Sequence, residues 1–235
     1  MSLYSVQSYY TQVAARVKAG GRRGAAGRRS EQAAQTRQRI IEAAAKRFTQ
    51  SGYGPTSINS IAREAGVAPE TIYKAFGTKR QILEALIDSS VVGRVSNRPL
   101  SVLRILAFAA IRTEPDQRRR LAMLANLTRT ILERAGPIHA VIRSAAANDP
   151  EIGALRLQQQ ASRLRGQTEF VRLLAQAGPL RQGVSLKDAA YHYWILASPE
   201  IQHILVQEQG WSNDSYEAWL LEALDALLRP AKLNA

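Results

Sequence analysis

The chain of 235 residues contains no cysteine and only three histidines. The absence of cysteine excludes disulfide bonds, thiolate metal sites and cysteine nucleophiles together. His139, His192 and His203 lie far apart and do not form a His-x-x-x-His motif, so we expect no metal site. Nucleophile elbows, phosphate-binding loops and metal motifs are also missing. These absences argue against an enzyme, and we expect no cofactor.

Long apolar runs are absent as well, which argues against a membrane span, and the first residues lack the apolar segment of a cleaved signal peptide. We therefore expect a cytoplasmic protein. Acidic residues are scarce: 19 Asp and Glu stand against 32 Lys and Arg, a formal net charge of +13. A basic balance of this size is typical of proteins that bind nucleic acid.

Residues 1–30 contain six basic side chains and no acidic one, and residues 20–29 are rich in glycine and arginine. This composition buries too little apolar surface to order itself, and it predicts a flexible arm. Two interpretations remain open. In the first, the arm, with Arg28 and Arg29, follows the DNA backbone or enters a minor groove. In the second, the arm is a solvated tail.

The sequence from Thr56 to Phe76 has the pattern of two short helices joined by a glycine turn. Thr56 is a candidate N-cap, and an apolar stripe at helical spacing ends at Ala65. Gly66 can adopt the left-handed conformation that ends a helix, and Pro69 suits the first turn of the next one. Ile72 and Phe76 point into a core, which leaves a polar face for DNA: Glu70, Thr71, Tyr73 and Lys74. We interpret this unit as a DNA-binding helix-turn-helix; the alternative is an ordinary helical hairpin with a solvated polar face.

Two further helices flank this unit. An amphipathic helix is expected over 36–50, with Ile40, Ile41 and Phe48 on its apolar side. Thr78 can cap a helix that starts at Lys79.

The segment from Thr36 to Leu86 resembles the DNA-binding domain of the TetR (tetracycline-repressor-like) family of bacterial transcriptional regulators. The resemblance covers about fifty residues, and its matching positions are Ile41, Ala44, Phe48, Gly52, Tyr53, Thr56, Ile61, Ala62, Ala65, Gly66, Val67, Thr71, Tyr73, Phe76, Lys79 and Leu83.

The resemblance implies that Thr56, Tyr73 and Lys79 touch the DNA backbone. It places Pro69, Glu70, Thr71 and Lys74 nearest the bases. Two residues depart from the family pattern. Ala68 stands where a capping serine is frequent, which we expect to weaken the second helix by about 1 kcal/mol. Glu70 replaces a small residue, and its carboxylate either accepts from a cytosine amine or favours the helix N-terminus.

The rest of the chain is predicted to be helical, because its apolar residues recur at helical spacing and capping residues, prolines and glycines mark the helix ends. Pro150 and Pro199 follow the capping residues Asp149 and Ser198, and Ser185 begins a capping box. The expected helices span 98–112, 115–135, 137–147, 150–177, 186–197, 199–209 and 213–229. The predicted fold is all-α: an arm over 1–30, a helix-turn-helix DNA-binding domain over 31–88, and a larger helical effector-binding and dimerisation domain over 89–235.

The last helix presents one wide apolar stripe that needs a partner. Together with the helices expected over 186–209, we expect it to form a four-helix interface between the two chains of a homodimer, with burial inside one chain as the alternative. The expected interface residues are Tyr216, Trp219, Leu220, Leu224 and Leu227.

TetR-like proteins usually enclose a small ligand among their middle helices, and ligand binding there weakens DNA binding by thermodynamic coupling. The candidate lining here lies on apolar helix faces, where a simple core position is the alternative. It consists of Phe108, Met123, Leu127, Ile131, Phe170, Leu174, Tyr191 and Trp194. Arg118, Arg119 and Arg120 could bind an anion, although a charge run at a helix start is more often solvated.

The function that follows is a sequence-specific transcriptional regulator, expected to be a repressor that a small molecule releases from a palindromic operator. The alternative is an architectural protein that coats DNA without sequence preference. That alternative explains the basic charge but gives no role to a large apolar C-terminal domain.

Overall fold

The computed structural model describes residues 25–92, 94–95, 98–99 and 108–230. Most of the predicted arm, residues 1–24, lies outside the described residues. The fold is all-α, as the sequence predicts, apart from one short antiparallel pair in which β1 (Arg94–Val95) lies beside β2 (Arg98–Pro99). Because Arg98 lies in this pair, the helix expected to start there is wrong at its N-terminus; helical residues are described over 108–113. No helix of the described part is long and apolar enough to cross a bilayer.

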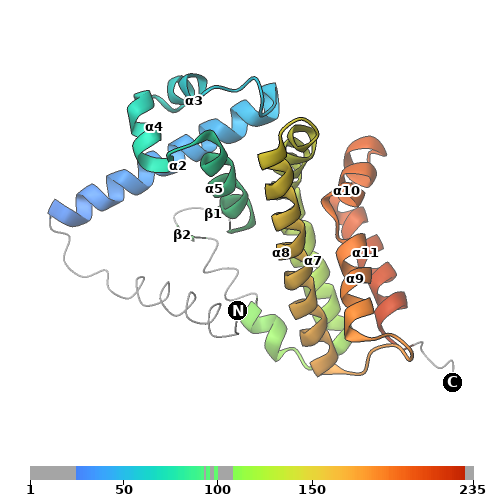
Figure 1. Ribbon diagram of the computed structural model, residues 1–235. Coiled ribbons are helices and arrows are strands. Elements are labelled where there is room, and N and C mark those ends of the chain that lie inside the picture. The colour runs from blue at the N-terminus through green and yellow to red at the C-terminus, as the bar shows by residue number, and fades with distance from the viewer. Residues whose placement is uncertain (1–24, 93, 96–97, 100–107, 231–235) are drawn as a thin grey trace.

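The N-terminal domain, residues 25–92, consists of four helices (Figure 1). They are α2 (Ala25–Ser51), α3 (Ile58–Ala65), α4 (Pro69–Phe76) and α5 (Lys79–Val92). The start of α2 corrects one expectation, since residues 25–30 are helical rather than part of a flexible arm. The domain boundary expected at residue 88 falls inside α5, which continues to Val92.

The C-terminal domain, residues 108–230, is a bundle in which α7 packs against α8 and α11, and α9 packs against α8 and α11 (Figure 1). Its elements are α7 (Gln117–Ala146), α8 (Pro150–Ala177), α9 (Leu186–Leu196), α10 (Pro199–Gln202), the π-helix η1 (His203–Glu208) and α11 (Asn213–Leu228). The predicted helices from residue 150 onward agree with these bounds to within one or two residues, apart from the π-helical second half of 199–209.

Side-chain caps explain why these helix ends were predictable. Asp149 accepts from the backbone N–H groups of Glu151 and Ile152, and Ser185 and Ser198 each accept from a residue three positions on. These oxygens satisfy N–H groups that have no partner inside the helix.

Pro137 lies inside α7, where the sequence predicts the end of one helix at residue 135 and the start of another at residue 137. That expected break is wrong. The residues after Pro137 remain helical because Ile138, Val141 and Ile142 are buried against the N-terminal domain, and this burial outweighs the hydrogen bond that proline cannot donate.

Two hydrophobic cores meet along α7. The N-terminal core joins the buried side of α2 to α5 with Ile138, Val141 and Ile142 of α7 and with Ile152 and Leu155 of α8. The C-terminal core contains the earlier α7 residues up to Leu132 together with residues of α8, α9 and α11. Both domains are therefore attached to the same pair of helices.

Three basic side chains hold the N-terminal domain together by binding backbone carbonyls. Arg37 donates to Ala75 at the end of α4 and stacks on Phe76, and Arg39 donates to the carbonyls of Ala65 and Gly66 at the end of α3. The Lys79 ammonium donates to three carbonyls of the α2–α3 connection, those of Tyr53, Gly54 and Thr56, at 2.9 to 3.2 Å. Cations placed here satisfy carbonyls that have no helical partner.

The Lys79 bonds generate a stability prediction. We expect Lys79→Met, which keeps the aliphatic stem, to lower the free energy of unfolding by about 1–3 kcal/mol, because hydrogen bonds to a charged group are lost. Chemical denaturation of the full chain measures this. The control is Lys74→Met, at an exposed position without a described partner, where a change within about 0.5 kcal/mol is expected. Equal stability of the two variants would show that the ammonium does not hold the connection.

Candidate functional site

The most exposed functional feature is the outer face of α4. The turn before it places Gly66 in the left-handed region at φ 62° and ψ 44°, and Val67 donates back to the Ala62 carbonyl at 3.0 Å. Ile72 and Phe76 are buried in the N-terminal core. This arrangement is the predicted helix-turn-helix, and it fixes which side of α4 meets solvent.

The solvent side of α4 presents three side chains with no described intramolecular partner. Tyr73 is 56% exposed, and Glu70 and Lys74 are also exposed. Thr71 and Pro69 are half-buried beside them. A phenol, a carboxylate and an ammonium on one short helix offer both donors and acceptors to phosphates and base edges.

The N-terminus of α4 has no side-chain cap, as the presence of Ala68 predicts. The cap position is extended, at φ −72° and ψ 146°, and Pro69 occupies the first turn. Pro69 has no N–H and the Thr71 N–H donates to the Ala68 carbonyl at 3.0 Å, so the Glu70 N–H is the first-turn donor without a described partner. A phosphate oxygen is an acceptor that such a helix end favours.

The structure corrects the role expected for Thr56. Its side chain is 1% exposed, and its hydroxyl donates to the carbonyls of Gly52 at 2.7 Å and Arg47 at 3.2 Å. The N-cap of α3 is the next residue, Ser57, which forms a capping box with Ser60. The hydroxyl is thus buried and directed at backbone carbonyls of its own chain, so we assign Thr56 to stabilising the connection instead.

The remaining basic candidates occupy different surroundings. The Lys79 ammonium is bonded to three carbonyls, and burial lowers the pKa of this amine. Arg29 is exposed on the N-terminal part of α2, and the side chain of Arg28 lies outside the described residues.

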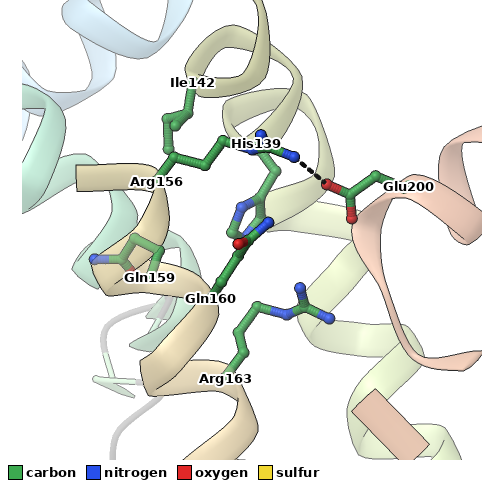
Figure 2. A pocket seen from close by; sticks show the side chains of 7 residues that line it. All are labelled: His139, Ile142, Arg156, Gln159, Gln160, Arg163 and Glu200. Atoms are coloured by element: carbon green, nitrogen blue, oxygen red, sulfur yellow. Dashed lines mark ion pairs between the residues drawn. The ribbon is translucent and has the colours of Figure 1, made fainter. Parts of the chain in front are cut away.

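A second site lies in the C-terminal domain, as a polar cavity of about 10 Å³ between α7, α8 and α10. Figure 2 shows side chains from three helices converging on this space. The lining consists of His139 and Ile142 from α7, Arg156, Gln159, Gln160 and Arg163 from α8, and Glu200 from α10.

The charges of this cavity are unbalanced. Arg156 Nη2 lies 3.7 Å from Glu200 Oε1, the ion pair drawn in Figure 2. Arg163 has no acidic side chain within ion-pair distance among the described residues; its Nη2 donates to the carbonyls of Ala197 at 3.1 Å and Trp194 at 3.3 Å. Burial lowers the pKa of Arg163 and, together with the Arg163 charge, lowers the pKa of His139 to about 4. At neutral pH the site thus contains two cations, one anion and a neutral imidazole.

None of the eight predicted ligand-lining residues lines this cavity. Phe170 and Leu174 are buried in the C-terminal core, with Phe108, Met123 and Leu127 packed against it, and Tyr191 is 42% exposed. Ile131 is half-buried on α7. Trp194 comes nearest, because its ring lies 5.6 Å from the Arg163 guanidinium. Apolar helix faces alone do not indicate this cavity, because most of its lining consists of polar residues of α8.

The predicted dimer residues are also placed differently from what was expected. Tyr216, Leu220 and Leu224 are fully buried inside the chain's own C-terminal core, so they cannot meet a second chain. Trp219 and Leu227 are half-buried at its edge. Among the described residues, the large exposed apolar side chains include Tyr73 on α4 and Leu157 on α8. The others lie on α9, on η1 and in the turn that follows: Leu186, Tyr191, Ile195, Ile204 and Trp211.

Comparison with known proteins agrees with this geometry. Residues 40–86 match the family model described as bacterial regulatory proteins, tetR family. The chain is 35% identical over 104 residues to the HTH-type transcriptional regulator AcrR of Shigella flexneri, covering 40% of this chain and 48% of AcrR. It is 42% identical over 62 residues to TtgR of Pseudomonas putida, covering 26% of this chain and 30% of TtgR. The aligned part thus spans about half or less of these curated relatives.

Solved structures match over a greater length but at low identity. The transcriptional regulator FadR from Bacillus subtilis, in complex with stearoyl-CoA, superposes with a TM-score of 0.62 at 19% identity, over 80% of this chain and 96% of FadR. A transcriptional regulator from Aquifex aeolicus gives a TM-score of 0.58 at 16% identity, over 81% of this chain and 98% of that one. These likenesses show the fold of both domains. The helix-turn-helix region, residues 40–86, thus matches the tetR family of bacterial regulatory proteins, and the helical fold of both domains is similar to that of solved transcriptional regulators.

Proposed function

We propose that the chain is a sequence-specific transcriptional regulator, a repressor that a small molecule releases from a palindromic DNA operator. The observation that supports this best is the exposed face of α4, where Glu70, Tyr73 and Lys74 project from a helix fixed by the Gly66 turn. The matched family is one of regulatory proteins rather than enzymes.

In this proposal α4 enters a major groove with its uncapped N-terminus toward a phosphate. Tyr73 contacts the backbone, and Pro69, Glu70, Thr71 and Lys74 lie nearest the bases. Arg28 and Arg29, on the extension of α2, add contacts to neighbouring phosphates. Lys79 supports this surface by holding the α2–α3 connection in place.

A homodimer fits this function because a two-fold protein reads two half-sites about one DNA turn apart. The surface we assign to it contains the exposed apolar side chains of α9 and η1, which include Tyr191, Ile195 and Ile204. An isologous interface places the same apolar patch on both partners, so each copy covers the other. Trp219 and Leu227 lie at the edge of the C-terminal core and remain candidates for the rim.

Release by a small molecule is supported by the fold. The FadR relative was solved with stearoyl-CoA, and both cores of the present chain meet along α7. A ligand that favours one arrangement of the two domains must weaken DNA binding by the same factor by which DNA weakens ligand binding. The protein would act in the cytoplasm, where the DNA is.

The first test is protection of the DNA around the chain's own gene. We expect a palindromic footprint at near-physiological salt with excess competitor DNA, because base contacts from two symmetric α4 helices exceed nonspecific attraction. Even coating of all DNA would favour the architectural alternative, for which the net charge of +13 is the supporting observation.

The two groups of α4 residues should respond differently to substitution. Tyr73→Ala should weaken binding to operator and random DNA alike, because a phosphate contact is not sequence-specific. Thr71→Ala and Lys74→Ala should change the preference among operator variants, each by about 1–3 kcal/mol at the affected base pair. Fluorescence anisotropy with operator and mutated probes measures both effects. Arg165→Ala, at an exposed position on α8, is the control for a lost charge; equal losses on every probe for all three α4 variants would contradict the assignment.

The proposed interface predicts the oligomeric state. Ile195→Glu places a charge at a position of α9 that is 51% exposed in the single chain, and we expect it to convert the dimer to a monomer because the charge would be buried without a partner. Leu157→Glu, at a 66% exposed position on α8, is the matched control and should remain dimeric. Sedimentation velocity distinguishes the two. A dimeric Ile195→Glu variant would move the interface away from α9.

A further inference from the structure

The polar cavity of Figure 2 lies where the two hydrophobic cores separate. On α8 the N-terminal core ends at Leu155, and the C-terminal core resumes at Leu164, which packs against it. Arg156, Gln159, Gln160 and Arg163 occupy the interval. These four positions are spaced 3, 1 and 3 residues apart, so they share one face of the helix. That face is turned toward α7 and α10 rather than entirely toward water.

Arg163 has unused hydrogen-bonding capacity at this place. Its Nη2 donates to two carbonyls, while Nε and Nη1 have no acceptor among the described residues. Both atoms are accessible from the cavity or from solvent. A partly buried guanidinium without a carboxylate partner is a costly arrangement, and it favours any anion that can reach it.

Arg156 is only loosely paired. Its 3.7 Å separation from Glu200 is too long for a hydrogen bond, so the pair gains Coulomb energy without the directional contacts of a bidentate ion pair. His139 adds no charge of its own near neutral pH, which leaves the cavity with one more positive than negative group.

We propose that this cavity binds the carboxylate group of a small monoanionic effector between Arg156 and Arg163. The inference rests on the proposed function, since it specifies the chemical class of the ligand that releases the operator. Planar guanidinium groups match a carboxylate in geometry, and the amides of Gln159 and Gln160 supply further donors. The present volume of about 10 Å³ holds one water-sized group, so the carboxylate enters by displacing the Glu200 side chain from Arg156.

Displacement of Glu200 explains how binding would be communicated. Glu200 lies in the first turn of α10, two residues before Gln202, whose side chain lies against Gly136 of α7. The same segment continues into η1, which contains Ile204 of the proposed dimer surface. An anion that replaces Glu200 therefore loosens α10 from α8 beside the dimer surface, while Arg156 and Arg163 stay attached to α8.

The test uses acetate, with acetamide as its neutral counterpart and chloride as a simple anion, titrated into the full-length chain. Tryptophan fluorescence is the readout because Trp194 lies 5.6 Å from the Arg163 guanidinium and donates to the Gln160 carbonyl. We expect a saturable change with acetate and none with acetamide. Arg156→Gln should raise the midpoint about tenfold, because a charge-assisted contact is lost. Glu200→Gln should lower it, because the competing carboxylate is gone.

Arg165→Gln, at an exposed position on the same helix, is the matched control and should leave the midpoint unchanged. Arg163→Lys keeps the charge but removes the planar fork, and should weaken acetate binding without the loss of fold that a neutral residue risks. Equal response to acetamide, equal affinity for chloride, or weaker acetate binding in Glu200→Gln would overturn the proposal. These titrations contain no DNA. A chain that binds acetate but protects no operator contradicts the proposed function, whereas a chain that protects an operator but ignores acetate contradicts this inference alone.

Discussion

The burial of α7 in two cores at once is the constraint on which the rest of the structure depends. Residues up to Leu132 pack with α8, α9 and α11, and residues from Ile138 onward pack with α2 and α5. Separating the two domains would expose the apolar side chains of Ile138, Val141 and Ile142, each of which contributes about 1.5–3 kcal/mol when fully buried. The orientation of α4 is therefore tied to the C-terminal bundle through apolar contacts rather than through a free linker.

The basic residues fall into two groups: some donate hydrogen bonds to backbone carbonyls, and others are exposed to solvent. Arg37, Arg39 and Lys79 donate to carbonyls and stabilise the N-terminal domain, and Arg120 does the same in the C-terminal domain, where it donates to Glu114 and Leu173. Lys74 and Arg29 remain exposed. A high net charge thus overstates the surface available to DNA, because part of that charge is used to satisfy the backbone.

Helix ends and the exposed face of α4 could be predicted from the sequence, because residues close together in the chain determine them. Asp149 before Pro150, Ser198 before Pro199 and the left-handed Gly66 each determine a helix end through their own chemistry, and the α4 face followed from Ile72 and Phe76. Prediction failed where a choice depends on tertiary packing. Thr56 and Ser57 can both cap α3, and only the closeness of Arg47 and Gly52 determines that Thr56 is the buried one.

The spacing of apolar or polar residues along a helix also does not identify which other helix packs against that face. The apolar stripe of α11 predicts burial but not whether its own chain or a second one covers it; here α7 and α9 do so. The polar stripe of α8 from Arg156 to Arg163 has the spacing of a solvated face, although it lines a cavity between two cores. Both outcomes depend on which helices meet, and spacing along one helix contains no such information.

Pro137 determines where α7 is mechanically weakest. Pro137 has no N–H to donate to the Glu133 carbonyl, so one helical hydrogen bond is missing there. The residue before it, Gly136, has no side chain to restrict the backbone. This point falls between Leu132 and Ile138, where α7 passes from one core to the other. α7 is therefore easier to bend at this point than in the turns on either side, where the helical hydrogen bonds are complete. A small bend at this point would move the far end of the N-terminal domain by a greater distance than it moves the residues next to the bend.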